Sequence, residues 1–207
     1  MARPTGTRNP GFERKRRELA ERVALRAVEP DGREVSMREL ARAADVSVPT
    51  LRHYFGDREG ALAAAFDAMN HLGESHVRRM AEDHIDDLER SVRFAVTYLI
   101  QGFRDFGVGR MLGGAMAHAM ANEQLGPAFL DALLEPTLQA VERRLAVHIE
   151  RGEMHPVDPR HAAIGLVSPM LVAALHQGEL GGTQCRPLDL EALGATQVEA
   201  FLRAYAA

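Results

Sequence analysis

The sequence predicts an all-α protein, and three observations support this fold class. Apolar residues recur at the i, i+3, i+4, i+7 spacing of amphipathic helices in several segments of the 207 residues. Alanine is frequent, whereas β-branched residues do not form the long alternating runs that are typical of strands. Serine or aspartate also stands where several of these segments begin, as helix caps do. With 46% hydrophobic residues, the chain can build a substantial core.

Charge is distributed unevenly along the chain. Residues 1–58 hold 13 Lys and Arg against 9 Asp and Glu, a net charge of +4, whereas residues 59–207 carry −8. The net charge of −4 for the whole chain hides this difference. A basic head on an acidic body is expected of a protein that touches phosphate with one end only.

The first helix is predicted behind a short arm. Residues 1–13 are rich in proline and glycine, which predicts a flexible arm. Apolar residues then recur every fourth position from Arg14 to about Glu29, so this segment is expected to be helical until Pro-Asp-Gly at residues 30–32 ends it. The basic run at residues 14–17 either follows a DNA backbone, enters a minor groove or is simply solvated.

The second and third helices are predicted from their caps. Ser36 precedes Glu39 by three residues, the spacing of a capping box, in which each side chain accepts the backbone N–H of the other residue. A tight turn is expected at residues 45–46, and Ser47 then caps the third helix. The outer side of this helix carries donors and small apolar groups that suit a major groove, namely Val48, Pro49, Thr50, Arg52 and His53.

The segment from Ser36 to Leu62, SMRELARAADVSVPTLRHYFGDREGAL, resembles the helix-turn-helix of the TetR family of repressors. The likeness is strongest in AADVSVPTL, in the HYF that follows, and in the acidic-basic-acidic start of the next helix. The resemblance implies a three-helix DNA-binding domain at residues 1–56 and an effector-binding and dimerisation domain at residues 57–207. It also implies double-stranded DNA as a partner.

Individual DNA contacts are implied by the same resemblance. Phosphate contacts are expected from Ser36, Ser47, Tyr54 and Arg58, and base-edge contacts from Val48, Pro49 and Thr50. Arg52 departs from the family, which usually has tyrosine at this position. Because arginine can contact either a phosphate or a guanine edge, binding is expected to persist while the preferred operator sequence changes.

The remaining pattern predicts a helical body. A long helix is expected from Asp57 to about Glu82, with its start at the DNA end and its middle in the body. Further helices are expected at residues 88–106, 111–123 and 127–151, the last kinked by Pro136, and two more at 158–177 and 189–205.

The last two of these helices predict a homodimer. Both are apolar nearly all round, and a terminal helix that is apolar on two sides needs a partner on each. We expect one side to pack on the same chain and the other on a second copy. The residues expected at this dimer interface are Leu171, Leu175, Phe201 and Leu202.

The central helices are candidates for an effector pocket. In the TetR family such helices enclose a pocket, and flexible methionines suit a small apolar effector of irregular shape. The residues expected to line it are Phe94, Tyr98, Phe103, Met111, Met116, Met120 and Met170. The same stripe of methionines and aromatic residues is also compatible with a plain core.

Catalytic and metal-binding alternatives find little support in the sequence. No glutamate is followed by histidine three residues later, the pairing that a di-iron helical bundle requires. A Gly-rich phosphate loop and a Gly-x-Ser-x-Gly motif are both missing. His84 with Asp86 and Asp87 is better explained as solvated charge than as a metal site. We therefore expect no enzymatic activity, no metal and no cofactor.

The sequence also bears on the cellular compartment. Cys185 is the only cysteine, so an intramolecular disulfide is excluded. This thiol is either incidental or responsive to redox conditions. The N-terminus lacks the apolar stretch of a signal peptide, and no segment approaches the ~20 apolar residues that span a bilayer. A cytoplasmic protein without membrane contact is expected.

Two functions fit these observations. The first is a dimeric repressor that binds a palindromic operator and is released by a small apolar effector. The second is a DNA-binding protein of the same fold that binds constitutively and uses its body for protein partners. In the first, a ligand that displaces the middle of the helix at residues 57–82 would tilt its start and move the recognition helix.

Overall fold

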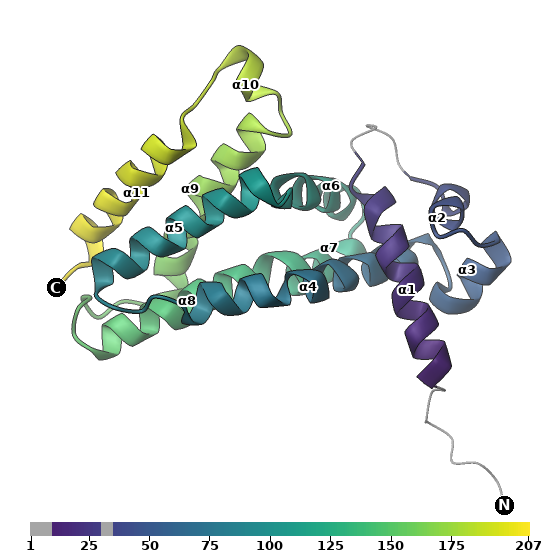
Figure 1. The fold of residues 1–207 in the computed structure, drawn as a ribbon, viewed down its shortest axis with the longest axis horizontal. Coiled ribbons are helices and arrows are strands. Elements are labelled where there is room, and N and C mark those ends of the chain that lie inside the picture. Colours follow the sequence, from purple (N-terminus) through teal and green to yellow (C-terminus); the bar gives the residue numbers. More distant parts are fainter. Residues whose placement is uncertain (1–9, 30–34) are drawn as a thin grey trace, which may run out of the picture.

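The computed structural model describes residues 10–29 and 35–207, which form helices joined by turns and short loops (Figure 1). This confirms the all-α prediction. At one end lie α1 (Pro10–Ala27), α2 (Met37–Ala43) and α3 (Val48–Phe55), and α4 (Arg58–Glu82) runs from this group into the body. The body continues with α5 (Leu88–Asp105), α6 (Val108–Ala121), α7 (Leu125–Phe129), the π-helical turn η1 (Leu130–Leu134), α8 (Glu135–Glu150), α9 (Pro159–Gln177), α10 (Gly182–Cys185) and α11 (Leu190–Tyr205).

Helix α1 starts four residues earlier than the apolar pattern predicts. The predicted arm is wrong for residues 10–13, which are helical, while residues 1–9 lie outside the described residues. Pro10 is tolerated at the first helical position because the amides of a first turn have no intrahelical partner anyway. The helix ends at Ala27, and the predicted stop at residues 30–32 also lies outside the described residues.

Helix α4 matches its predicted limits. The Asp57 side chain accepts the backbone N–H of Gly60 at 2.8 Å and so caps the first turn. The helix then continues for 25 residues to Glu82. It packs against α1 at one end and against α8 in the body (Figure 1). A single rigid element therefore connects the N-terminal helices with the far end of the molecule.

A π-helical turn lies just before Pro136, the residue at which the sequence predicts a kink. Proline has no amide hydrogen, so the regular hydrogen-bond ladder cannot pass through it. In the structure the widened turn η1 stands directly before α8, and Pro136 occupies the first turn of that helix.

Helix α6 begins at Val108 rather than at Met111, where the sequence predicted its start. Gly107 adopts the left-handed conformation (φ 66°), which allows an abrupt turn after α5.

The hydrophobic residues form two cores, and α4 contributes to both. The first core joins α1, α2 and α3 to the nearer half of α4, and it also contains Leu112 of α6 and Leu125 and Phe129 of α7. The second core lies in the body, where α5, α8, α9 and α11 surround Met80 at the far end of α4. None of the helices in the described residues is long and apolar enough to cross a membrane.

Candidate nucleic-acid interface

A complete capping box fixes the start of α2. The Ser36 amide and hydroxyl donate to Glu39 Oε2 at 2.8 and 2.7 Å, and the Glu39 amide donates back to Ser36 Oγ at 3.3 Å. Arg26 of α1 also donates to this carboxylate at 3.2 Å. The donors from Ser36, and then Arg26, lower the pKa of Glu39 to about 2. The predicted cap is therefore confirmed, and it also ties α2 to α1.

The turn between α2 and α3 is held by backbone geometry. Asp45 adopts a positive φ of 55°, a conformation that aspartate tolerates better than most residues. The amide of Val46 donates to the carbonyl of Ala41 at 3.0 Å. In addition, Arg22 of α1 donates to the carbonyl of Ala44 at 3.2 Å, so the turn rests on the first helix. The predicted tight turn is thus confirmed.

Helix α3 begins with a second cap and presents a polar outer side. Ser47 Oγ accepts the amide of Thr50 at 3.2 Å and lies 2.8 Å from the Thr50 hydroxyl. Leu51 and Phe55 point into the first core and hold the helix in place. Of the predicted DNA contacts on this helix, Pro49, Arg52 and His53 are exposed, and Val48, Thr50 and Tyr54 are half-buried. The side of α3 that faces solvent therefore carries a guanidinium, an imidazole and small apolar groups.

Arg58 has an internal role that the sequence did not predict. Its side chain is only 14% exposed. The Nε group donates to the carbonyl of Val35 at 2.6 Å, and Nη1 donates to Glu59 at 2.8 Å. Arg58 thus links the start of α4 to the residue just before the cap of α2. Its phosphate contact stays a prediction and would have to be made from this linked position.

Two sequence families match the chain. Residues 30–65 match the family described as bacterial regulatory proteins, tetR family. Residues 99–207, more than half of the chain, match the C-terminal domain of AefR-like transcriptional repressors. The chain belongs to the TetR family. It is therefore a DNA-binding transcriptional regulator, and the members of this family are transcription factors rather than enzymes.

Solved structures support the same fold. A TetR-family transcriptional regulator from Mesorhizobium loti is 23% identical, with a TM-score of 0.76 over 96% of this chain and 100% of its own. A TetR regulator from Haloarcula marismortui is 14% identical, with a TM-score of 0.70 over 95% and 100%. SmeT in complex with triclosan is 16% identical, with a TM-score of 0.62 over 94% and 92%. No curated protein matches the sequence.

In this TetR-family chain, the residues expected to line an effector pocket lie in different places. Met170 is buried in the second core, whereas Met111 and Met116 pack on the first. Phe103 contacts both cores, and Met120 is 83% exposed. Three hollows in the described part of the chain lie at the α1–α3–α4 junction, between α5 and α11, and between α1 and α2, and their linings contain other residues. Four of the seven share the second core, namely Phe94, Tyr98, Phe103 and Met170, and the effector pocket itself stays a prediction.

Phe94 and Tyr98 belong to a stack of rings between α4 and α5. The ring centres of Tyr98 and His76 are 4.1 Å apart, and those of Phe94 and Tyr98 are 5.3 Å apart, both nearly parallel. His84 lies 4.9 Å from Phe94 at the other end of the stack. Burial, and then the nearby Arg79 charge, lowers the pKa of His76. These aromatic side chains therefore fasten α5 to α4.

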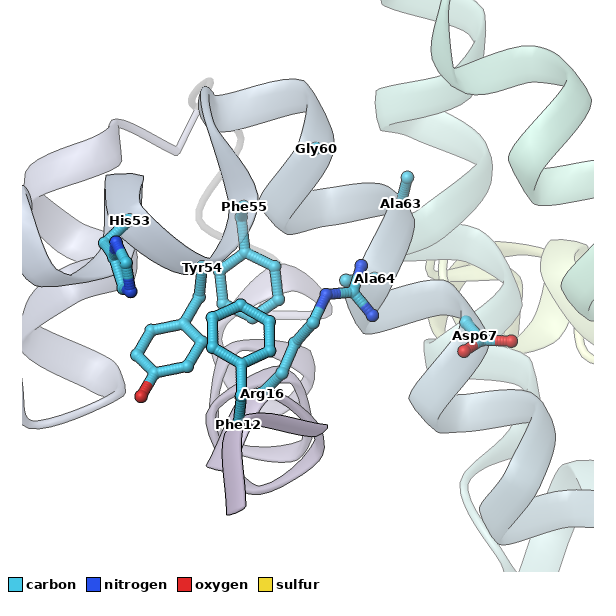
Figure 2. Close-up of a pocket in the computed structure, with 9 residues that line it drawn as sticks. All are labelled: Phe12, Arg16, His53, Tyr54, Phe55, Gly60, Ala63, Ala64 and Asp67. Carbon is cyan, nitrogen blue, oxygen red and sulfur yellow. The ribbon is translucent and has the colours of Figure 1, made fainter. Parts of the chain in front are cut away.

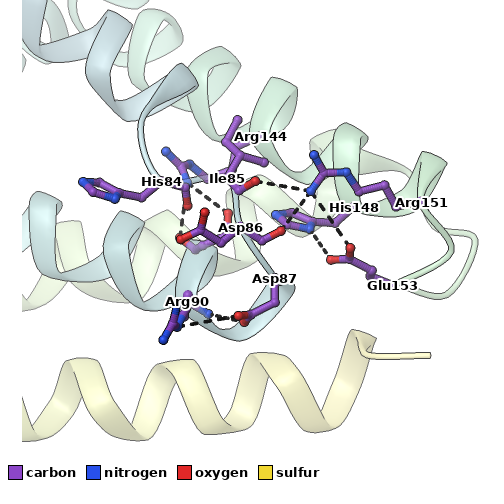
Figure 3. A network of polar contacts seen from close by, with 10 residues as sticks. His84, Ile85, Asp86, Asp87, Arg90, Arg144, His148, Arg151 and Glu153 are labelled. Atoms are coloured by element: carbon purple, nitrogen blue, oxygen red, sulfur yellow. Dashed lines mark hydrogen bonds and ion pairs between the residues drawn. The ribbon is translucent and has the colours of Figure 1, made fainter.

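A buried arginine network closes the far end of the body (Figure 3). Arg144 of α8 is fully buried and donates to the carbonyl of Met80 at 2.8 Å, to the carbonyl of Asp83, and to the Ser91 hydroxyl at 2.9 Å. Burial lowers its pKa to about 10. Sequence reasoning missed this residue, because its partners lie more than 50 positions away in the chain.

Nearby polar residues complete the same end of the molecule. Arg151 donates to the carbonyl of Asp86 at 2.9 Å, and Asp87 caps α5 by accepting the amide of Arg90. His148 is buried and lies 2.6 Å from Glu153. Among the described residues, no group of three or more His, Cys, Asp or Glu side chains could hold a metal ion. In this loop, the Asp87 carboxylate thus caps α5, and Asp86 contributes its backbone carbonyl.

The four residues expected at a dimer interface also differ in exposure. Phe201 is only 3% exposed and lies in the second core of its own chain. Leu171, Leu175 and Leu202 are half-buried. On α9, however, Ile164 and Val172 are 39% and 65% exposed. The free apolar surface of α9 is therefore centred on residues that the sequence pattern did not single out.

Proposed function

We propose that this TetR-family regulator is a cytoplasmic, dimeric repressor that binds an inverted-repeat operator and is released by a small apolar effector. The observation that carries the DNA-binding part is the outer side of α3. Its guanidinium, imidazole and small apolar groups stand on a helix held by a cap at its start and by Leu51 and Phe55 beneath. The side chains proposed to contact DNA are Ser36, Ser47, Val48, Pro49, Thr50, Arg52, His53, Tyr54 and Arg58.

The proposed dimer uses the outer side of α9 together with α11. Ile164, Ser168 and Val172 follow one another at four-residue spacing and are all exposed. Gly165 lies in the same stripe and is exposed as well, so a second helix could approach closely. Leu175 and Leu202 border this surface, and Leu171 and Phe201 contribute from beneath by shaping the core. A two-fold axis here would place two α3 helices on one operator.

The proposed effector mechanism runs through α4. Met69 of this helix is buried in the first core, and Arg58 at its start is bonded to the carbonyl of Val35. A ligand that moves the middle of α4 would therefore pull on the segment that begins α2. Because both recognition helices must enter successive major grooves about 34 Å apart, a small splaying would remove one half-site. The solved complex of SmeT with triclosan supports a small apolar compound as the class of effector.

A constitutive DNA-binding protein with protein partners remains the second candidate. It is favoured by one specific observation: Phe94 and Tyr98 stack on each other and pack against His84 and His76, so their rings are occupied within the protein. In that case the body would offer only its outer surfaces to partners. The aromatic stack would then be purely structural.

One titration distinguishes the two candidates. An operator duplex is first isolated by selection from random DNA on the purified protein. Small apolar compounds, beginning with triclosan, are then titrated into the protein with and without this duplex. The repressor proposal expects the compound to bind more weakly in the presence of operator, by the same factor by which it weakens operator binding. Equal affinities in the two titrations contradict release by that compound, and a footprint without two-fold symmetry contradicts the dimeric operator complex.

A further inference from the structure

The early start of α1 brings an aromatic side chain onto the recognition helix. Phe12 stacks on Tyr54 of α3 with ring centres 4.7 Å apart and an interplanar angle of 26°. Its ring also meets His53 edge-on at 5.8 Å. Had the chain been an extended arm at this point, as the sequence suggested, this contact would be missing. The first turn of α1 therefore supports the last turn of α3.

Arg16 adds a second contact of the same kind. It lies four residues after Phe12, on the same side of α1, and its guanidinium carbon is 5.3 Å from the ring centre of Phe55. Phe12 and Arg16 thus hold three consecutive residues of α3 from one direction. Through them, the basic run at residues 14–17 is fixed relative to the recognition helix.

A hollow lies beside these contacts, so the Tyr54 ring depends on Phe12 for packing on this side. The hollow has a volume of about 530 Å³ and lies between α1, α3 and α4. Its α4 side is lined by small or short side chains, Gly60, Ala63, Ala64 and Asp67. Figure 2 shows Phe12 against the Tyr54 ring, with the tyrosine hydroxyl pointing away from the hollow. Because α4 offers no large side chain here, the packing of Tyr54 on this side comes from α1.

We propose that Phe12 is a positioning residue for DNA binding, which holds the Tyr54 ring so that its hydroxyl faces a backbone phosphate. The proposal rests on the phosphate contact proposed above for Tyr54. A half-buried tyrosine that can change rotamer must be ordered when DNA binds, and this ordering reduces affinity. Stacking on Phe12 orders the ring before DNA arrives. Loss of Phe12 should therefore weaken binding roughly three- to tenfold.

The test is a double-mutant cycle on the full chain. Wild type, Phe12→Ala, Tyr54→Phe and the double variant are titrated with a mixed-sequence duplex at low salt, because a phosphate contact serves all sequences alike. Tyr54→Phe keeps the stacked ring and removes only the hydroxyl. We expect Phe12→Ala to weaken DNA binding when Tyr54 is present. In the Tyr54→Phe background, we expect it to change the DNA affinity less than about 1.5-fold. Phe12→Trp, which can still stack, should restore wild-type affinity.

A spectroscopic readout checks the geometry independently of DNA. The chain has three tyrosines, so labelling with 3-fluorotyrosine gives three fluorine signals, and the one that Tyr54→Phe removes belongs to Tyr54. Phe12→Ala should shift this signal and leave those of Tyr98 and Tyr205 unchanged, which also shows that the body is folded. Phe106→Ala, at a 70% exposed phenylalanine of the body, is the matched control and should affect neither DNA affinity nor the Tyr54 signal.

The outcomes separate this inference from the function on which it rests. An equal loss of affinity on Phe12→Ala with and without the Tyr54 hydroxyl would overturn the positioning role. An unmoved Tyr54 signal would do the same. If Tyr54→Phe binds as wild type, the phosphate contact of Tyr54 fails and the inference fails with it, although DNA binding stands. Absence of any duplex binding by wild type would instead contradict the proposed function itself.

Discussion

The guanidinium of Arg144 lies over the ring of Phe94, with its central carbon 4.9 Å from the ring centre. The same guanidinium donates to the carbonyls of Met80 and Asp83 at the end of α4. One side chain from α8 therefore joins the end of α4 to the aromatic stack on α5. This contact closes the end of the molecule farthest from the helix-turn-helix (Figure 1).

Replacing Arg144 by methionine should destabilise the protein by about 2–4 kcal/mol, because buried carbonyls at the end of α4 lose their donor. Chemical denaturation followed by circular dichroism measures the change. Arg143→Met, at the exposed neighbouring position, is the control and should stay within about 0.5 kcal/mol of wild type. Similar losses in both variants would show that the buried network is not what stabilises this end.

The lowered pKa of His76 predicts a loss of stability in mild acid. Folding keeps this imidazole neutral, so protons bind the unfolded chain preferentially once the pH falls below the ordinary histidine value of about 6.5. The contribution of His76 to stability is therefore complete above that pH and decreases below it. His76→Phe preserves stacking on Tyr98 and should flatten the dependence of the urea midpoint between pH 7 and pH 5. His71→Phe, at an exposed histidine of the same helix, should keep the wild-type slope.

The lowered pKa of Glu39 predicts a second loss of stability, at lower pH. Its pKa is lowered from 4.5 to about 2 by the donors from Ser36 and Arg26. The stabilising effect of its carboxylate is therefore fully present above pH 4.5 and is lost as the pH falls toward 2. Glu39→Gln should be less stable than wild type at pH 7, and the difference should shrink steadily in acid. A difference that does not change with pH would contradict a role for the charge.

Substitutions on the recognition helix α3 should distinguish side chains that set sequence preference from side chains that contribute equally to affinity for all DNA sequences. Arg52→Ala should change which base pairs are preferred and cost about 1–3 kcal/mol at the selected operator if this side chain meets a guanine edge. Selection of random DNA with the wild type and with the variant gives the two preferences. Unchanged preference with uniformly weaker binding would make Arg52 a phosphate contact instead. Arg143→Ala, on the body, is the control and should change neither the sequence preference nor the DNA affinity.

The exposed surface of α9 predicts how the proposed dimer can be broken without unfolding the chain. Ile164→Glu combined with Val172→Glu should give monomers in analytical ultracentrifugation, because both side chains are exposed and two carboxylates there would oppose association. Phe201→Glu is unsuitable for this test, since its side chain lies in the core. Asp131→Asn, at an exposed position of η1, serves as a control, and a double variant that remains dimeric would place the interface elsewhere.

The sequence predicted features whose causes are local. The capping box of Ser36 and Glu39, the cap of Ser47 and the full length of α4 follow from residues within a few positions of one another. Phe12 and Arg144 were missed because their partners lie far along the chain. Periodicity shows which side of a helix is apolar but not which other helix it meets. For the same reason, the residues assigned to an effector pocket on the central helices stay a prediction.

The first core extends across residue 56, the border predicted between the two domains. The residues beneath the helix-turn-helix pack against Leu112, Leu125 and Phe129, which belong to the body. A fragment that ends with α3, or even with α4, would leave apolar surface uncovered and should not fold alone. Exchange of N-terminal halves between relatives would then succeed only if α6 and α7 are exchanged as well. A new DNA specificity is therefore expected to evolve through substitutions on the outer side of α3 rather than through exchange of the whole N-terminal domain.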